Sequence, residues 1–336
     1  MDEFILALFA PGDKLKATTL YQLLIGKKTT SVLLFGCLHD LLPFVGLFPK
    51  VSQRDFEIQL QKLVQEGHLI DVKEGFYQRG QGIELTKEKQ QVLNHLNHFR
   101  YGKSEAAAWR MLQFVIQVAS NYHRQPTFIP LETAPMFTEP VRLLIRQQQE
   151  HLREILKEEL TQLLGQLDQE IANKLAQSFS GWQVVGKTSY QLLPPWASDA
   201  PWNYLVPLAW HQAFFQEVER ETNLVCYQLL APFFLWDRNQ SSLSTQALFE
   251  AGFSFEEVCQ KRQLKPGTIN DHLIEWALRD DKFIFADFIA PASEKLLANK
   301  PGDPLTWRFK EVASLEVDFL SFALYQIKTK EERKCF

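Results

Sequence analysis

The sequence predicts a mainly α-helical protein with a winged-helix-like N-terminal module, a helical middle region containing one long helix, and a C-terminal helix-turn-helix. Three patterns support this fold class. A helical segment is followed by an alternating hairpin pattern near residue 70, a long run after residue 140 has apolar residues at helical spacing, and three short capped helices follow residue 240. We place the domains at residues 1–85, 86–235 and 236–336.

Composition is that of a soluble globular protein, with 46% hydrophobic and 23% charged residues in 336. The longest apolar run, Val32 to Phe48, is interrupted by polar residues and proline, and it is shorter than the roughly 20 apolar residues of a membrane helix. The N-terminus carries acids where a secretory signal carries lysine or arginine. We therefore expect no membrane span and a cytoplasmic location.

Metal and cofactor sites are not predicted. The four cysteines are scattered without a C-x-x-C pair, which argues against a zinc knuckle and a disulfide framework. His95 and His98 are spaced to share one face of a helix, but no carboxylate or cysteine at helical spacing completes a site. We interpret them as surface histidines.

The N-terminal module has the order of a winged helix. The segment TTLYQLLIG has helical spacing, a second helix begins at Ser52 and ends before Gly67, and two short strands alternate around Gly75. Acidic residues balance the basic ones here, so this surface is not an obvious DNA-binding one. The candidate DNA- or partner-facing residues on the helix and the wing are Arg54, Lys62, Lys73 and Arg79.

The middle region is predicted to hold one long amphipathic helix from Val141 to Phe179. A proline-punctuated connector, Gln125 to Pro140, precedes it, and no regular element is expected there. The apolar stripe of the helix keeps i, i+3, i+4 spacing. We favour packing of this stripe on the chain itself, and self-association through the helix is the alternative.

The letters from Gly181 to Thr188 match the phosphate-binding pattern G-x-x-x-x-G-K-[ST]. The loop of a nucleotide-binding site needs an apolar strand before it and a helix after it. Here a polar helix end precedes the segment, and Pro194 stops any helix after about one turn. The pattern therefore favours a tight turn with Lys187 facing solvent, and a P-loop nucleotide hydrolase is the least favoured function.

The strongest local signals lie between Ser242 and Leu278, which predict three short helices with tight turns. The first helix ends at Gly252, and Ser254 with Glu257 forms a capping box for the second. Thr268 is expected to cap the third helix together with Asp271. This order is that of a helix-turn-helix, whose last helix enters the major groove in DNA-binding members.

The outer face of the third helix is poorly suited to DNA. Between residues 238 and 282 the acids outnumber the basic residues by one, and acids on the approaching helix oppose phosphates. We therefore favour protein binding or a scaffold role over duplex reading, with DNA binding possible and weak. The candidate DNA- or partner-facing residues are Lys265, Thr268, Asn270, Asp271, Glu275 and Arg279.

The segment SFEEVCQKRQLKPGTINDHLIEWAL closely resembles the helix-turn-helix at the C-terminus of certain RecQ-type helicases and of the YpbB-like family of Firmicutes. The final stretch, Glu311 to Lys328, and the N-terminal TTLYQLLIGKKTTSVL are also similar to that family. The middle matches by length and helical character only. The resemblance implies a protein that accompanies a RecQ-like helicase lacking its own C-terminal accessory domains.

Our leading hypothesis is a non-enzymatic accessory factor of a RecQ-like helicase in DNA replication or repair. The chain has no helicase motor motifs, so ATP hydrolysis would belong to the partner. The alternative is a sequence-specific helix-turn-helix transcription regulator that uses one or both modules on duplex DNA.

Overall fold

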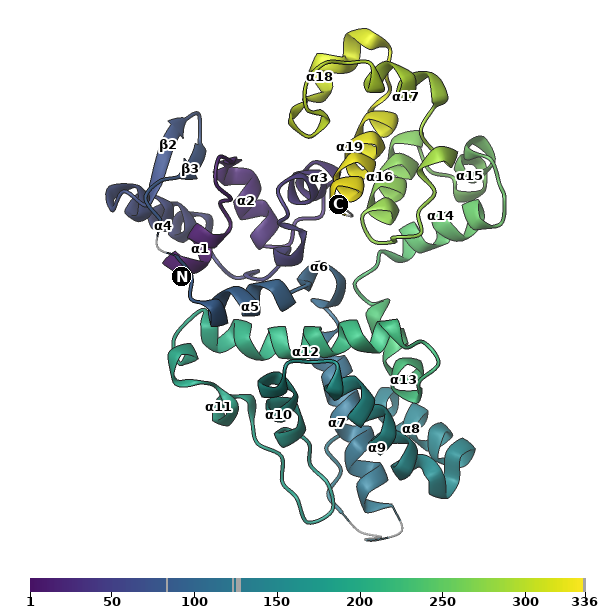
Figure 1. Ribbon diagram of the computed structural model, residues 1–336. Helices are drawn as coiled ribbons and strands as arrows, with labels where there is room; N and C mark the ends of the chain where they lie inside the picture. The colour runs from purple at the N-terminus through teal and green to yellow at the C-terminus, as the bar shows by residue number, and fades with distance from the viewer. Residues whose placement is uncertain (83, 123, 125–127, 335–336) are drawn as a thin grey trace. The chain divides into compact units, whose positions relative to one another are not determined.

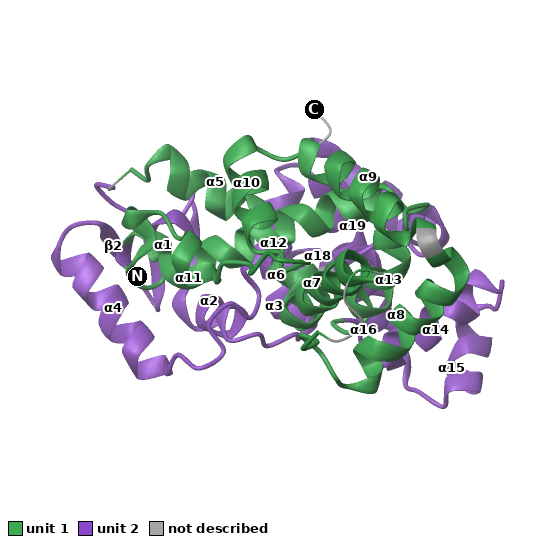
Figure 2. Ribbon diagram, turned by 90° about the horizontal axis from the view of Figure 1, so that it is seen from below, with its two compact units in different colours: residues 1, 3–5, 84–237 green, residues 2, 6–83, 238–336 purple. Residues whose placement is uncertain are grey.

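The computed structural model describes residues 1–82, 84–122, 124 and 128–334. The chain forms two compact units (Figure 2). Unit 1 holds residues 1, 3–5 and 84–237, and unit 2 holds residues 2, 6–83 and 238–336. The boundaries predicted at 85 and 235 lie close to the junctions between the units. The division into three domains remains a prediction.

The N-terminal part of unit 2 is winged-helix-like, because an antiparallel hairpin follows a group of helices and pairs with one short strand that precedes them (Figure 1). The sheet has the strand order β1-β3-β2, and in it Leu15 lies opposite Tyr77 and Ile70 lies opposite Gln78. The elements are α1 (Asp2–Ala7, divided between the units), β1 (Lys14–Lys16), α2 (Ala17–Leu24), α3 (Thr30–Leu38), α4 (Gln53–Gln65), β2 (Leu69–Lys73) and β3 (Phe76–Arg79), with a 3-10 turn at Leu42–Phe44.

Local signals place α4, β2 and β3 where the sequence predicted them, whereas α1, β1 and α3 were not predicted. The Ser52 side chain accepts a hydrogen bond from the backbone N–H of Asp55 at 3.1 Å and so caps α4. Gly67 follows that helix with φ +76°, and Gly75 has φ +77° in the turn between β2 and β3. Both positions need the left-handed conformation that glycine adopts without strain. The predicted helix and hairpin are therefore confirmed.

The C-terminal part of unit 2 begins with the three helices of the helix-turn-helix and continues to a long final helix. The elements are α14 (Gln240–Glu250), α15 (Phe255–Arg262), α16 (Pro266–Ala277), α17 (Pro291–Ala298), α18 (Phe309–Val312) and α19 (Phe319–Lys334), with 3-10 turns at Phe285–Asp287, Pro304–Thr306 and Ala313–Leu315. The predicted C-terminal helix-turn-helix and mainly α fold class are confirmed.

One hydrophobic core joins the two parts of unit 2. Leu34 and Cys37 of α3 are buried in the same cluster as Leu273 of α16 and Leu324 of α19. Helix α3 packs against both α16 and α19. Burying apolar side chains is the main stabilising term in folding, so the N-terminal helices and the helix-turn-helix stabilise one another.

The regular elements in the described residues of unit 1 are all helices. Helix α12 lies at its centre and packs against α5, α7, α9, α10 and α13. Its Phe214 and Phe215 are fully buried. The elements are α5 (Lys87–His95), α6 (His98–Tyr101), α7 (Glu105–Asn121), α8 (Pro135–Gln148), α9 (Leu152–Gly165), α10 (Gln169–Gln177), α11 (Ser189–Leu192), α12 (Trp202–Arg220) and α13 (Val225–Phe234), with 3-10 turns at Gln149–His151 and Pro195–Ala197.

The prediction of one long helix from Val141 to Phe179 is wrong, because three helices, α8, α9 and α10, share this stretch. Gln149 breaks the first helix with φ +45°. Gly165 ends α9, and the Asp168 side chain then caps α10 by accepting from the N–H of Glu170 at 2.8 Å. The apolar stripe is nonetheless used inside unit 1, because Leu144, Leu152, Leu156, Leu163 and Leu175 are all buried.

The predicted connector, Gln125 to Pro140, is shorter than expected. Its first three residues lie outside the described residues, but α8 already begins at Pro135. Proline suits the first helical position, where its missing N–H has no intrahelical partner, and Pro140 is accommodated five residues further on. Across the described ranges, no helix combines the length and apolar character needed to cross a membrane.

Candidate nucleic-acid interface

The helix-turn-helix is built from sharply capped helices. Ser254 and Glu257 form the predicted capping box of α15, in which each side chain accepts a hydrogen bond from the backbone N–H of the other residue. Gln263 has φ +52° and ends that helix. The third helix starts earlier than predicted, because Pro266 occupies its first position and Lys265 precedes it as an N-cap without a side-chain bond. Thr268 therefore lies inside α16, and its predicted capping role is wrong.

The inner face of α16 is fixed by packing and by one buried polar contact. Ile269 and Leu273 are fully buried on α14 and α19. His272 is also buried, and its Nδ1 lies 2.9 Å from the Oγ1 of Thr245 on α14. The predicted apolar stripe of this helix is confirmed.

The buried imidazole makes the stability of unit 2 depend on pH. Burial lowers the pKa of His272 below the usual 6.5, and Arg262 adds to this effect while Glu275 and Asp271 oppose it. The folded protein therefore binds fewer protons here than the unfolded chain, and the free energy of unfolding falls as pH drops from 6.5 through the folded pKa.

We expect urea unfolding of unit 2 to show a lower midpoint at about pH 5.5 than at about pH 7.5. In His272→Gln the difference between the two pH values becomes smaller. Burial also lowers the pKa of His95, which lies in unit 1. His95→Gln is therefore the matched control, and it should leave the pH dependence of unit 2 unchanged. An unchanged pH difference in His272→Gln would contradict the assignment.

The outer face of α16 is engaged within the protein. The carboxylate of Asp271 accepts a hydrogen bond from the hydroxyl of Thr30, the first residue of α3. Glu275 pairs with Arg279 at 3.1 Å, with only 14% and 4% of their side chains exposed. These three of the predicted DNA- or partner-facing residues therefore make contacts inside unit 2.

The other candidates on α16 lie near its N-terminus. Lys265 is exposed, and Thr268 and Asn270 are half-buried. Residues near the start of the last helix make the base contacts in DNA-binding helix-turn-helix proteins. Asp271 is exposed as well, so the accessible part of this helix carries one lysine and one acid.

The candidates on the winged-helix-like module are spread over helix and hairpin. Arg54 is exposed in the first turn of α4, and Lys73 is exposed at the end of β2 with φ +82°. Arg79 is half-buried in β3. Lys62 bonds the carboxylate of Asp2 at 2.6 Å, and this hydrogen bond raises the pKa of Lys62.

Charge does not favour DNA along this surface. From residue 53 to residue 79 there are four basic side chains against five acidic ones. Clustered lysine and arginine supply most of the affinity for a phosphate backbone. Neither candidate surface therefore has the strongly basic character of a tight non-specific DNA binder.

The contact between Thr30 and Asp271 was missed by sequence reasoning because the two residues are 241 positions apart. Arg262 was missed too. Its guanidinium donates to the backbone carbonyl of Ser241 at 3.1 Å and to the Ser241 hydroxyl at 2.7 Å, which ties α15 to α14. A basic residue in the last turn of a helix gives no indication of such a structural role.

The segment from Gly181 to Thr188 is a tight turn. The backbone groups of Gly181 and Val184 bond each other in both directions at 2.9 and 3.1 Å. The ammonium of the exposed Lys187 donates a hydrogen bond to the side-chain oxygen of Gln177 at 2.8 Å. Helix α10 precedes the turn, and the helix after it, α11, has four residues. The predicted turn is therefore confirmed, and it lacks the strand that leads into a phosphate-binding loop.

The histidine pair in unit 1 is less exposed than predicted. His98 is buried, with its Nδ1 at 3.4 Å from the Nε2 of Gln212, and His95 is half-buried. The interpretation as two surface histidines is wrong, because α12 covers α5 and α6. No group of three histidine, cysteine or acidic residues within the described part of the chain is placed to hold a metal ion.

Comparisons with known proteins agree with this geometry. Residues 241–313 match the model of a helix-turn-helix domain family, a stretch that runs from α14 to the 3-10 turn after α18. The chain is 23% identical to Protein YpbB of Bacillus subtilis (strain 168) over 333 residues, covering 94% of this chain and 92% of that protein. No solved structure matches the chain. The predicted resemblance to YpbB-like proteins is confirmed, and the matches suggest a DNA-binding helix-turn-helix protein.

Proposed function

We propose that this protein is a non-enzymatic accessory factor of a RecQ-like DNA helicase in the bacterial cytoplasm. In this role the helix-turn-helix contacts the helicase, and DNA binding is weak and assisted by the partner. Tethering to a protein that already holds DNA raises the effective concentration of the strand, so a weak contact becomes useful.

The observation that supports this proposal best is the engagement of the α16 outer face. Asp271 remains exposed but accepts a hydrogen bond from Thr30. Glu275 and Arg279 pair with each other and are largely buried, so these side chains are already engaged within the protein. A helix-turn-helix whose outer side chains are already paired is better suited to protein contacts than to the recognition of DNA bases. The resemblance of the segment to the C-terminus of RecQ-type helicases supports the choice of partner.

The test is retention of the full chain on the immobilised RecQ-like helicase of the same cell, followed by unwinding of a forked duplex. We expect retention at moderate salt and a changed unwinding rate. Lys265→Glu should weaken retention, because it reverses the charge at the accessible start of α16. Lys50→Glu, at another exposed position, is the matched control. No retention together with no effect on unwinding contradicts the proposal.

A transcription regulator is the second candidate, and the match to a helix-turn-helix family supports it. This function predicts submicromolar binding that depends on duplex sequence. If Lys265 contacts a phosphate, Lys265→Ala lowers the slope of log affinity against log salt by about one. Fluorescence anisotropy with a random and a selected duplex separates the candidates, because an accessory factor binds both weakly and alike.

A further inference from the structure

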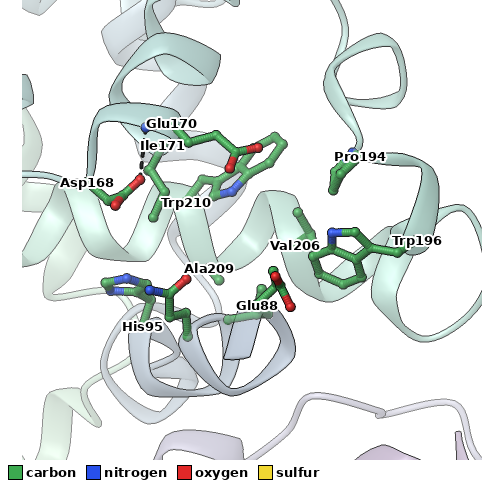
Figure 3. Close-up of a pocket in the computed structure, with 12 residues that line it drawn as sticks. Glu88, His95, Asp168, Glu170, Ile171, Pro194, Trp196, Val206, Ala209 and Trp210 are labelled. Atoms are coloured by element: carbon green, nitrogen blue, oxygen red, sulfur yellow. Dashed lines mark hydrogen bonds between the residues drawn. The ribbon is translucent and has the colours of Figure 1, made fainter. Parts of the chain in front are cut away.

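Unit 1 contains a cavity of about 70 Å³ between α5, α10, α12 and the 3-10 turn at Pro195–Ala197 (Figure 3). The cavity is therefore larger than the roughly 10 to 15 Å³ that a single water molecule needs, and it has room for a small polar group. The indoles of Trp196 and Trp210 form part of its wall, and apolar side chains such as Ile171 and Val206 complete it.

The charged side chains that line the cavity have one sign. Its lining includes the carboxylates of Glu88, Asp168 and Glu170, and none of the described residues that line it is lysine or arginine. Glu88 lies in the first turn of α5, where a backbone N–H and the Thr86 side chain lower its pKa. His95 also lines the cavity, and burial lowers its pKa, so it adds no positive charge near neutral pH.

The indoles are held in place. Trp196 packs edge-on against Trp202, with ring centroids 6.1 Å apart, and Trp202 is only 4% exposed. Trp210 is 7% exposed on α12. The same aromatic group already binds a cation of the chain itself. The ammonium of Lys89 lies 5.3 Å from the Trp202 ring centroid and 2.6 Å from the carboxylate of Glu3.

We propose that this cavity binds the cationic head group of an arginine or lysine side chain from a basic segment of a partner protein. An indole face attracts a cation through its quadrupole, and nearby carboxylates add Coulombic attraction. A metal ion fits less well, because no metal-binding group of three side chains is present among the described residues. The inference holds whether or not the partner is a helicase.

The test uses three pentapeptides, acetyl-Gly-Gly-X-Gly-Gly-amide, in which X is arginine, lysine or alanine. Each is titrated into the full-length ¹⁵N-labelled protein, and the indole N–H signals are followed by nuclear magnetic resonance. Substitution by phenylalanine assigns the signals of Trp196 and Trp210. We expect both signals to shift saturably with the arginine or lysine peptide and to stay unchanged with the alanine peptide. Equal shifts with all three peptides, or no shift, would overturn the proposal.

Variants locate the binding. Glu170→Gln should weaken binding of the arginine peptide by about two- to fivefold, the range of one exposed ionic contact. Its side chain is exposed, so the fold is retained. Glu158→Gln on α9, also exposed and outside the cavity, is the matched control and should change nothing. Equal effects of the two variants would overturn the proposal. Tenfold tighter binding of spermidine would reassign the cavity to a free polyamine and overturn the choice of a protein side chain.

Discussion

Leu273→Ala is expected to lower the free energy of unfolding of unit 2 by about 2 to 5 kcal/mol, the range for a buried leucine truncated to alanine. Leu273 is fully buried in α16, in the core that also contains Leu34 and Cys37 of α3. Because α3 and α16 share this core, the substitution should also destabilise the N-terminal helices. Hydrogen exchange measured by mass spectrometry should therefore become faster in α2 and α3 as well as in α14 to α16.

Leu296→Ala on α17 is the matched control for this prediction. That leucine is 42% exposed, so its truncation should change the free energy of unfolding by less than about 0.5 kcal/mol. If Leu273→Ala accelerates exchange only after residue 238, the two parts of unit 2 unfold independently and the shared core does not couple them.

Glu159→Ala is expected to destabilise unit 1 by about 2 to 4 kcal/mol, because it leaves two buried donors without an acceptor. The buried carboxylate of Glu159 on α9 accepts from the backbone N–H groups of Val225 and Cys226 at 2.8 and 2.9 Å. The N-cap residue of α13, Leu224, has no side chain that can accept. A carboxylate from another helix thus caps α13 and faces the positive end of its dipole.

Chemical denaturation of the variants measures this effect. Glu158→Ala changes the neighbouring exposed carboxylate on the same helix and should alter the free energy of unfolding by less than about 0.5 kcal/mol. Glu159→Gln keeps one acceptor oxygen and should fall between Glu159→Ala and the natural protein. Equal stability of Glu158→Ala and Glu159→Ala would show that the buried cap contributes nothing.

Local signals in the sequence predicted much of the fold. The capping box of Ser254 with Glu257 and the glycine turn at Gly75 depend on residues within a few positions of each other, so their chemistry is readable from the chain alone. The same holds for the stripe of α16. Its apolar positions recur at helical spacing, and packing then buries that face.

Two local predictions are wrong because capping residues decide where these helices begin and end. Leucine periodicity from Leu144 to Leu175 concealed Gly165 and Asp168, which mark a helix end and a helix start. At α16, the pair Thr268 and Asp271 predicts a helix start that is too late, because Pro266 occupies the first helical position. In both cases the residues that end or start a helix are visible in the sequence, and they decide the structure against the apolar periodicity or the alternative cap.

The candidate interface was harder to predict because its availability depends on distant residues. The apolar run around Leu34 predicted burial, but nothing in it indicates that α16 and α19 form the other side of that core. Likewise, Asp271 was expected on an outer face, and only the fold shows that Thr30 meets it. Contacts between residues far apart in sequence have no local signature.

The shared core of unit 2 also affects how the protein is made. The cluster around Leu34 is complete only when Leu324 has been synthesised, and residues 84–237 of unit 1 are synthesised between them. Domains generally fold as units during synthesis, with earlier segments folding first. Here the first helices leave the ribosome with apolar side chains whose partners do not yet exist. They are therefore exposed to aggregation and proteolysis until α19 emerges, so their need for chaperones should last until the end of translation, whereas residues 84–237 can complete the core of unit 1 earlier.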